Sequence, residues 1–248
     1  IEVIGNFDAL YPLIWERGAG AGKIGIGQAN GQMTIRGYWP GIRTGTPVDT
    51  TAYVIPARPW VVQPGQSLEA RVDLVSLKGD APGAVLAVYA GSEAGYWMMK
   101  GRDLVCLGKQ NGGITFFTAD KCTTPNANEV LVLALTPDGK NVILTARVLD
   151  KSNGNILYER SVVDTRAADP SMNYQQVTEL FGRTIYVAVD RSGAPWTSGS
   201  TPWLGVFQCT DGTLSAAEAT FDNFELRTYA YEVPQVGIEP AMRLTWPA

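Results

Sequence analysis

Apolar and polar residues alternate with a period of two along much of the chain. Residues 68–74 place Leu, Ala, Val and Leu at every second position with Glu, Arg and Asp between them, and residues 142–148 follow the same pattern. Such alternation is typical of a strand that buries one face and exposes the other. The pattern predicts strands near residues 31–37, 50–55, 68–77, 84–90, 95–99, 103–108, 113–118, 129–135, 141–150, 155–163, 184–190, 203–208 and 216–228.

Turn-forming residues separate the predicted strands. Such segments are Lys78-Gly79-Asp80, Asn111-Gly112-Gly113, Pro137-Asp138-Gly139 and Ser152-Asn153-Gly154. Connections this short join strands that are antiparallel neighbours. Apolar residues at helical spacing occur only in one short window, Asn173–Phe181, where we expect a short helix. The sequence therefore predicts an all-β fold, an antiparallel β-sandwich.

The domain organisation follows from length and from one change in composition. The chain has 248 residues, enough for one large β domain. We expect a single sandwich over residues 1–228. Beyond it, Pro234 and Pro240 interrupt any central strand, and the apolar segment 242–246 comes close to the end. Residues 229–248 are therefore predicted to form an extended C-terminal arm.

Composition excludes several classes of function. The chain contains no histidine, which rules out Ser-His-Asp triads, Cys-His pairs and His-ligated zinc or iron. The net charge is −4 without any run of Lys or Arg, so we expect no nucleic-acid partner. The longest apolar stretch, Val130–Leu135, is too short to span a membrane. Because the chain begins at Ile1 rather than Met, we expect a secreted, extracellular protein whose signal peptide has been removed.

Several segments together carry a family resemblance. They are Leu68–Leu74, Gly95-Tyr96-Trp97, 142–147, 156–160, and the closing pair Leu204-Gly205-Val206-Phe207 and 219–226, the last containing Phe-Asp-Asn-Phe. Their order resembles the concanavalin A-like lectin and glucanase superfamily, which includes laminin G-like domains of secreted bacterial proteins. The resemblance implies a jelly roll of two curved sheets, with carbohydrate bound on the concave sheet in those members that bind it.

The resemblance also implies a structural calcium ion where the first and last strands meet. In this chain, Asn6 or Asp8 would approach Asp222 there, and oxygen ligands of this kind suit calcium. The alternative is that Asp222 and Asn223 only shape a bulge in the last strand. Both interpretations stay open at the level of sequence.

Tryptophan residues are the candidates for binding a sugar ring, because an aromatic face covers the apolar face of a pyranose. Prolines flank two of them, and a third lies in a segment rich in Gly, Ser and Pro, which favours loop positions. The alternative is that these rings fill the core or anchor loops, the commoner role of Trp in a sandwich. The candidates are Trp39, Trp60, Trp97, Trp196 and Trp203.

No carboxylate arrangement indicates a glycosidase. The glucanases of the superfamily carry an E-x-D-x-x-E strand, which this chain lacks. Glu69 and Asp73 share one strand face with Arg71 between them, which favours a salt-bridged solvent face. Two carboxylates at the right separation would still suffice for hydrolysis.

The three cysteines allow one disulfide. Cys106 and Cys122 are the candidate pair, and closing the loop between them would stabilise the fold by about 3 kcal/mol. Cys209 would then be a lone thiol, either buried in its strand or available to another chain.

These observations leave three functions. The first is a secreted, non-catalytic structural or surface protein that self-associates through its apolar terminal segments, Ile1–Ile4 and Gln235–Trp246, and forms filaments or surface polymers. The second is a carbohydrate-binding module of a larger secreted protein, with a polysaccharide as its partner. The third is a carboxylate-based glycoside hydrolase. Beyond the calcium ion that the resemblance implies, no cofactor is expected.

Overall fold

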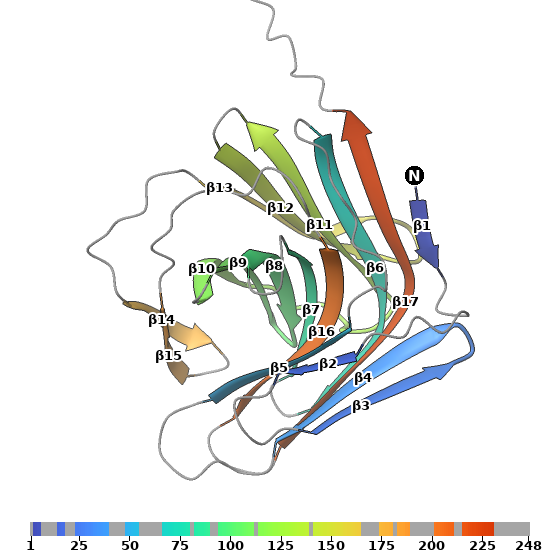
Figure 1. Cartoon of the computed structure of the whole chain (residues 1–248), viewed down its shortest axis with the longest axis vertical. Coiled ribbons are helices and arrows are strands. Elements are labelled where there is room, and N and C mark those ends of the chain that lie inside the picture. The colour runs from blue at the N-terminus through green and yellow to red at the C-terminus, as the bar shows by residue number, and fades with distance from the viewer. Residues whose placement is uncertain are drawn as a thin grey trace, which may run out of the picture.

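The elements in the described part of the chain are strands, and most of them form two stacked antiparallel sheets (Figure 1). The computed structural model describes residues 2–5, 14–17, 23–39, 48–54, 66–79, 82–89, 94–111, 114–138, 141–164, 174–180, 183–188, 201–210 and 215–230. Within these ranges no helix is long and apolar enough to cross a membrane. The predicted all-β antiparallel sandwich is confirmed.

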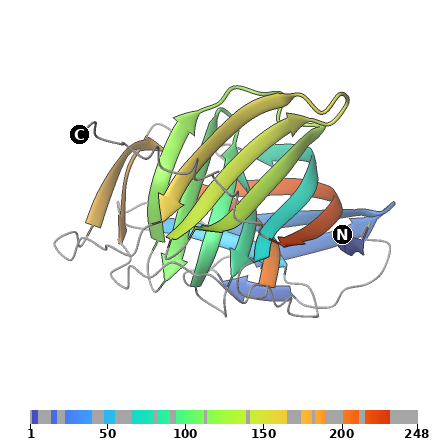
Figure 2. The same cartoon turned by 90° about the horizontal axis from the view of Figure 1, so that it is seen from above.

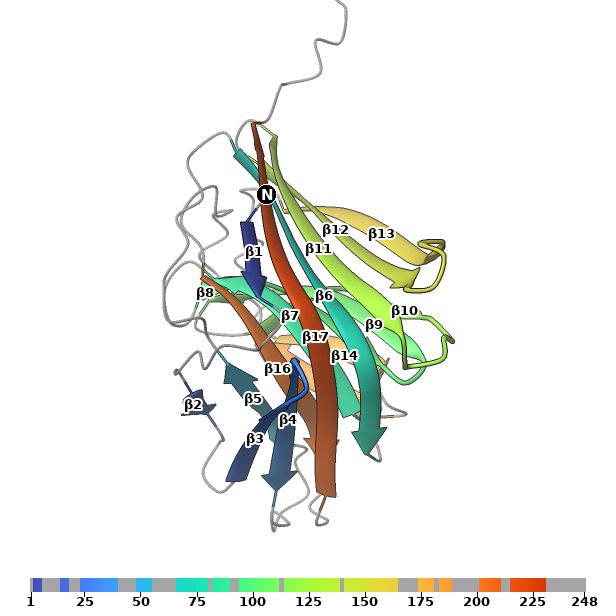
Figure 3. The same ribbon diagram turned by 90° about the vertical axis from the view of Figure 1, so that its right-hand side faces the viewer.

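The first sheet has eight strands. Its order is β13 (Ile156–Asp164), β12 (Asn141–Asp150), β11 (Glu129–Asp138), β6 (Gln66–Gly79), β17 (Ser215–Ala230), β4 (Gln32–Trp39) and β3 (Lys23–Ala29), with β1 (Glu2–Gly5) paired to β17. Figure 3 shows this sheet from the side, with β13 at one margin and β3 at the other.

The second sheet has seven strands and nests inside the curve of the first (Figure 1). Its order is β10 (Ile114–Lys121), β9 (Leu104–Asn111), β8 (Ala94–Gly101), β7 (Pro82–Tyr89), β16 (Thr201–Thr210), β5 (Val48–Val54) and β2 (Ile14–Arg17). A separate hairpin of β14 (Tyr174–Leu180) and β15 (Arg183–Ala188) contacts β10 at one end of the sandwich (Figure 2).

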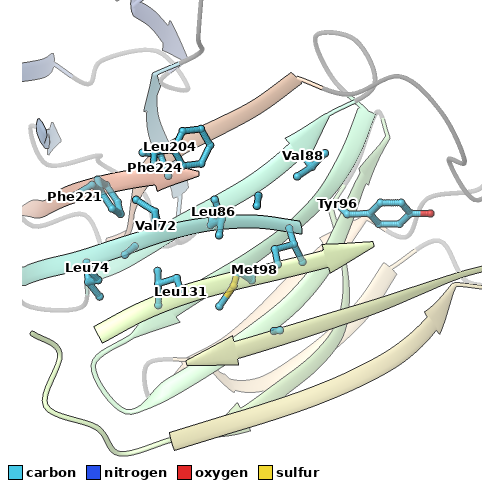
Figure 4. Close-up of a cluster of buried hydrophobic side chains, with 14 of the residues drawn as sticks. Val72, Leu74, Leu86, Val88, Tyr96, Met98, Leu131, Leu204, Phe221 and Phe224 are labelled. Carbon is cyan, nitrogen blue, oxygen red and sulfur yellow. The ribbon is translucent and has the colours of Figure 1, made fainter. Parts of the chain in front are cut away.

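The core lies between the sheets and is built from the alternating residues of the long strands. Leu68, Ala70, Val72 and Leu74 of β6 are all buried in it, as the sequence pattern predicts. Figure 4 shows Val72 and Leu74 among residues of β7, β8, β11, β16 and β17. Burial of these apolar side chains is the main force that holds the two sheets together.

The predicted short helix is wrong. Residues 174–180 form strand β14, which pairs antiparallel with β15. The window contains an aromatic and two β-branched residues, Tyr174, Val177 and Thr178, which favour a strand when a partner strand is present. Helical spacing over so short a window did not outweigh that pairing. The other predicted strands each have a counterpart, whereas β1, β2 and β3 were not predicted.

Strand β17 lies inside the eight-stranded sheet and pairs with strands on both of its sides. It pairs with β6 on one side; on the other it pairs with β4 along residues 215–221 and with β1 near residues 224–226. The N-terminal strand therefore pairs within its own molecule. Strand β17 continues to Ala230, and residues 231–248 of the predicted arm lie outside the described residues.

A charged cluster links three strands on the outer face of this sheet. The Glu218 carboxylate on β17 pairs with Arg36 on β4 and, at 3.3 Å, with Lys78 on β6. Burial alone raises the pKa of Glu218, but hydrogen bonds and charge from Arg36 and Lys78 outweigh it and hold the pKa below its ordinary value. The ionised carboxylate therefore stabilises the folded state.

Replacing Glu218 with glutamine is expected to lower the free energy of unfolding by about 0.5–1 kcal/mol at neutral pH, because both cations are largely exposed. A depressed folded-state pKa stabilises the protein above the unfolded-state value, near 4.5, and the effect is lost as the pH falls through the folded-state pKa. Urea unfolding of both proteins at about pH 7 and about pH 3 checks this. An equal difference at both pH values would contradict it.

Candidate functional site

The exposed apolar side chains gather on the edge strand β13. Pairing on one side only, with β12, leaves β13 as the last strand of the eight-stranded sheet. Ile156, Leu157 and Val163 on this strand are 58%, 41% and 50% exposed. Among the side chains that the structure describes, Tyr229 is the only other large apolar one with comparable exposure. An open strand edge with apolar side chains is the kind of surface onto which another strand adds.

Side chains on both faces hold β13 in place. On one face, Ser161 hydrogen-bonds Thr145 at 2.8 Å and Glu159 forms an ion pair with Arg147. On the other face, the Tyr158 hydroxyl donates to Asp120 of β10 at 2.7 Å. Burial first, and the Asp120 carboxylate second, raise the pKa of Tyr158, so its hydroxyl keeps its proton. The edge is therefore anchored to both sheets.

A buried ionic cluster lies at the end of β13. The Asp164 carboxylate accepts a hydrogen bond from the Tyr96 hydroxyl at 2.6 Å and pairs with the Lys109 ammonium at 3.1 Å. All three residues are buried. Tyr96 and Lys109 are neighbours on β8 and β9, so this cluster joins the two sheets. Figure 4 shows the Tyr96 hydroxyl pointing away from the apolar cluster.

A second buried cluster lies at the other end of β8. The Lys100 ammonium contacts the side chain of Asn126, and the backbone N–H of Asn126 donates to Glu129 at 3.0 Å. Lys100 and Glu129 are both buried. Sequence analysis singled out neither buried cluster.

On the concave face of the seven-stranded sheet, opposite the core, the side chains described on the neighbouring strands β8 and β9 include a buried apolar group. Trp97 is 7% exposed, and its neighbours Met99 and Cys106 on the same face are buried as well. Trp97 was a candidate for sugar binding, and its burial is a correction: the ring fills the interior and offers no face to a sugar. At this position the interpretation of Trp as a packing residue holds.

The other tryptophan candidates receive no structural description of their side chains. Trp39 lies at the end of β4 and Trp203 lies in β16, where only the strand itself is described. Trp60 and Trp196 lie outside the described residues. Their part in carbohydrate binding stays a prediction.

The predicted calcium corner shows a bulge at its acidic residue. The first and last strands do meet, since β1 pairs with β17. At Asp222 the pairing of β17 with β6 shifts register, and Asn223 adopts a left-handed φ of 47°. The Asn223 N–H donates to the Asp222 carboxylate at 2.8 Å. This geometry fits the bulge interpretation.

No metal cluster accompanies that bulge in the part of the chain that the structure describes, where no three acidic or cysteine side chains converge. Asn6 and Asp8 lie outside that part, so a calcium ion held with Asp222 stays a prediction.

The predicted disulfide is not present in the structure, because Cys106 and Cys122 are both free thiols. Cys106 stands opposite Ala119, whereas the Cys122 N–H donates to the carbonyl of Asp103, which precedes Cys106 by three residues. That offset is about 10 Å along a strand, beyond the reach of a disulfide. Burial raises the pKa of both thiols and keeps them protonated. Cys209 lies in β16, where only the strand is described.

Glu69 and Asp73 pair with cations, as predicted for that strand face. Glu69 lies 3.9 Å from Arg147 and 3.8 Å from Arg227, and Asp73 lies 2.9 Å from Lys151. The partners come from neighbouring segments rather than from Arg71.

Comparison with known proteins gives a likeness in structure only. No protein-family model matches the chain, and no curated protein matches it in sequence. Arcelin-5, a lectin-like defence protein from Phaseolus vulgaris, shares 10% identity at a TM-score of 0.42, covering 86% of this chain and 96% of its own. The carbohydrate-binding module CBM66 from Bacillus subtilis shares 14% identity at a TM-score of 0.36, covering 78% and 86%.

A glycosyl hydrolase family protein from Mycobacterium fortuitum shares 13% identity at a TM-score of 0.32, covering 81% of this chain and 75% of its own. The names of these neighbours describe lectin-like, carbohydrate-binding and hydrolase proteins. At such low TM-scores and identities the likeness does not bear on what this chain binds or catalyses, and membership of the concanavalin A-like superfamily stays a prediction.

Proposed function

We propose that the chain is an extracellular, non-catalytic structural protein whose β-sandwich subunits associate with one another through the β13 edge. The observation that carries the proposal is an open sheet edge bearing three exposed apolar side chains, Ile156, Leu157 and Val163. The occupant that we assign to this edge is a second copy of the chain. Because β1 pairs within its own molecule, β13 replaces the N-terminal segment as the expected contact.

The strand is self-complementary in an antiparallel arrangement. A two-fold axis at Arg160 would place Leu157 of one copy opposite Val163 of the other, and each apolar pair would leave water. Each Arg160 has an acidic neighbour, Asp120 at 3.7 Å, which offsets the approach of two cations at the axis. Such a contact has closed two-fold symmetry and joins two subunits. Growth into a filament needs a second contact between subunits. We predict that residues 231–248 supply it.

Replacing Val163 with lysine is expected to weaken self-association about tenfold or more, because the new charge would be buried against the apolar Leu157 of the partner copy. Sedimentation equilibrium over a range of concentrations measures this. The matched control is Tyr229→Lys, which alters an equally exposed apolar side chain on β17. A wild-type chain that stays monomeric, or an equal loss in the control, would overturn the assignment to β13.

Carbohydrate binding, the alternative function, receives no support from the described side chains. Its one described candidate, Trp97, is buried. Its remaining candidates are Trp39, Trp60, Trp196 and Trp203.

A further inference from the structure

Lys100 is a buried lysine whose amine lies against an amide side chain. Its residue exposure is 0%, and it continues the core-facing row of Tyr96 and Met98 on β8. Its Nζ lies 2.6 Å from Oδ1 of Asn126. It also contacts the backbone carbonyls of Gly101 and, at 3.4 Å, Arg102.

Two further hydrogen bonds position Asn126, and its backbone adopts a conformation that asparagine favours. Its Nδ2 donates to the Arg102 carbonyl at 2.8 Å, and its backbone N–H donates to Glu129 Oε1 at 3.0 Å. Its φ of 62° places it in the left-handed region, where asparagine is favoured among non-glycine residues. Because a C=O bond is about 1.23 Å long, the amide carbon of Asn126 lies within about 3.8 Å of the Lys100 amine. This is close to the separation of reacting atoms in a near-attack geometry.

Glu129 supplies a buried carboxyl group that contacts the backbone N–H of Asn126. It is 1% exposed and sits at the start of the core-facing row of β11. Its Oε1 accepts the Asn126 N–H, whereas its Oε2 is buried and has no hydrogen-bond partner among the described residues. A buried polar atom without a partner is costly, and at such a position a role in chemistry is a standard explanation.

We infer that Lys100 and Asn126 form an intramolecular isopeptide bond, with Glu129 carrying the proton. The neutral Lys100 amine attacks Cγ of Asn126, and a bond forms between Nζ and Cγ. The Glu129 carboxylate accepts a proton from Nζ and passes it to Nδ2, the Cγ–Nδ2 bond breaks, and ammonia leaves. The products are one secondary amide and one ammonia, so no oxidant, reductant or activated co-reactant is needed.

The surroundings favour the reactive form of each group. Burial lowers the pKa of Lys100, while the nearby Glu129 carboxylate opposes the shift. Burial thus increases the fraction of neutral amine, the nucleophilic form. The Arg102 carbonyl that Nδ2 contacts fixes the leaving group on one side of the amide. A positioned carboxyl group is a standard proton carrier in such acyl transfers.

The bond would link β8 covalently to the segment through which the chain passes from one sheet to the other. Lys100 lies near the end of β8 in the seven-stranded sheet, and Asn126 lies in the segment between β10 and β11, where the chain crosses to the eight-stranded sheet. A link at this place restrains the loop in the unfolded chain as a disulfide would. Unlike a disulfide it resists reduction, which suits a structural protein outside the cell. The inference uses none of the residues of the β13 edge, so either proposal can fail alone.

Intact-mass spectrometry of the purified full chain tests the inference. We expect the wild-type mass to fall below that of the sequence by one ammonia. After trypsin digestion, a branched peptide should join residues 79–102 to residues 122–140, with no cleavage after Lys100. A wild-type chain at full mass would overturn the inference, and so would a mass loss without the branched peptide, because succinimide formation at an asparagine also releases ammonia.

Three variants separate the bond from other effects. Asn126→Gly removes the amide at a left-handed position that glycine tolerates, and it should have its full expected mass. Asn128→Gly is the matched control, since Asn128 has a similar φ of 55° nearby, and it should keep the loss of ammonia. Glu129→Gln keeps the size of the side chain but accepts no proton, so it should stay unlinked. Bond formation in Glu129→Gln would overturn the role assigned to Glu129.

Discussion

Replacing Asp164 with alanine is expected to lower the free energy of unfolding by about 3–5 kcal/mol. The Asp164 carboxylate neutralises Lys109 at 3.1 Å and accepts the Tyr96 hydroxyl at 2.6 Å, and all three residues are buried between the sheets. Removing one partner of a buried ion pair leaves the other charge in a medium of low dielectric constant, and this penalty exceeds the net contribution of the pair itself. Denaturant unfolding followed by circular dichroism measures the loss.

Two further variants test the cause of that loss. Asp164→Asn keeps an oxygen acceptor for Tyr96 but removes the charge, so its loss should be smaller than that of the alanine variant. Glu159→Ala on the same strand is the matched control, because the Arg147–Glu159 pair is partly exposed, and it should lose less than about 1 kcal/mol. Equal losses for Asp164→Ala and Glu159→Ala would show that burial of the Asp164 pair does not matter.

Strand content was predictable because one side of most strands faces the core. The alternation of Leu68, Ala70, Val72 and Leu74 is a local pattern, and all four residues are buried as it indicates. Strand β3 was missed because its glycines, Gly25 and Gly27, weaken the strand pattern. Its pairing with β4 depends on the turn at residues 30–31, where both residues have positive φ, the geometry of a tight hairpin.

The buried charges were harder to predict, although the sequence contains a signal for them. Lys100 follows Tyr96 and Met98 at alternate positions, and Glu129 precedes Leu131 and the rest of its core-facing row. A charge at the end of an apolar row predicts a buried or partly buried group, but it does not name the partner. The partners depend on how the two sheets stack, which no local pattern encodes.

The concave face illustrates a misread local pattern. Residues 95–99 read Gly-Tyr-Trp-Met-Met, an apolar run without alternation, and such a run indicates burial on both faces of a strand. The prediction of Trp97 as a sugar-binding residue relied on the resemblance and on the chemistry of the ring. The run itself favoured packing, and the structure agrees with the run.

Replacing Trp97 with alanine is therefore expected to lower the free energy of unfolding by about 3–5 kcal/mol, the usual cost of deleting a large buried aromatic side chain. The ring is 7% exposed and lies on the same face as Met99 and Cys106. The matched control is Tyr229→Ala, which truncates an aromatic side chain that is 46% exposed and should change stability by less than about 0.5 kcal/mol. Far-ultraviolet circular dichroism under urea suits both variants, because it does not depend on the fluorescence of the deleted ring.

The same variant separates packing from carbohydrate binding. If Trp97 is a packing residue, its loss lowers stability, and below the unfolding transition the variant binds soluble oligosaccharides no differently from the wild type. A variant with wild-type stability that selectively loses binding would return Trp97 to the role of a sugar platform and favour the carbohydrate-binding alternative. A ring buried to this degree could stack on a pyranose only if the residues that cover it moved away. We therefore expect the variant to lose stability.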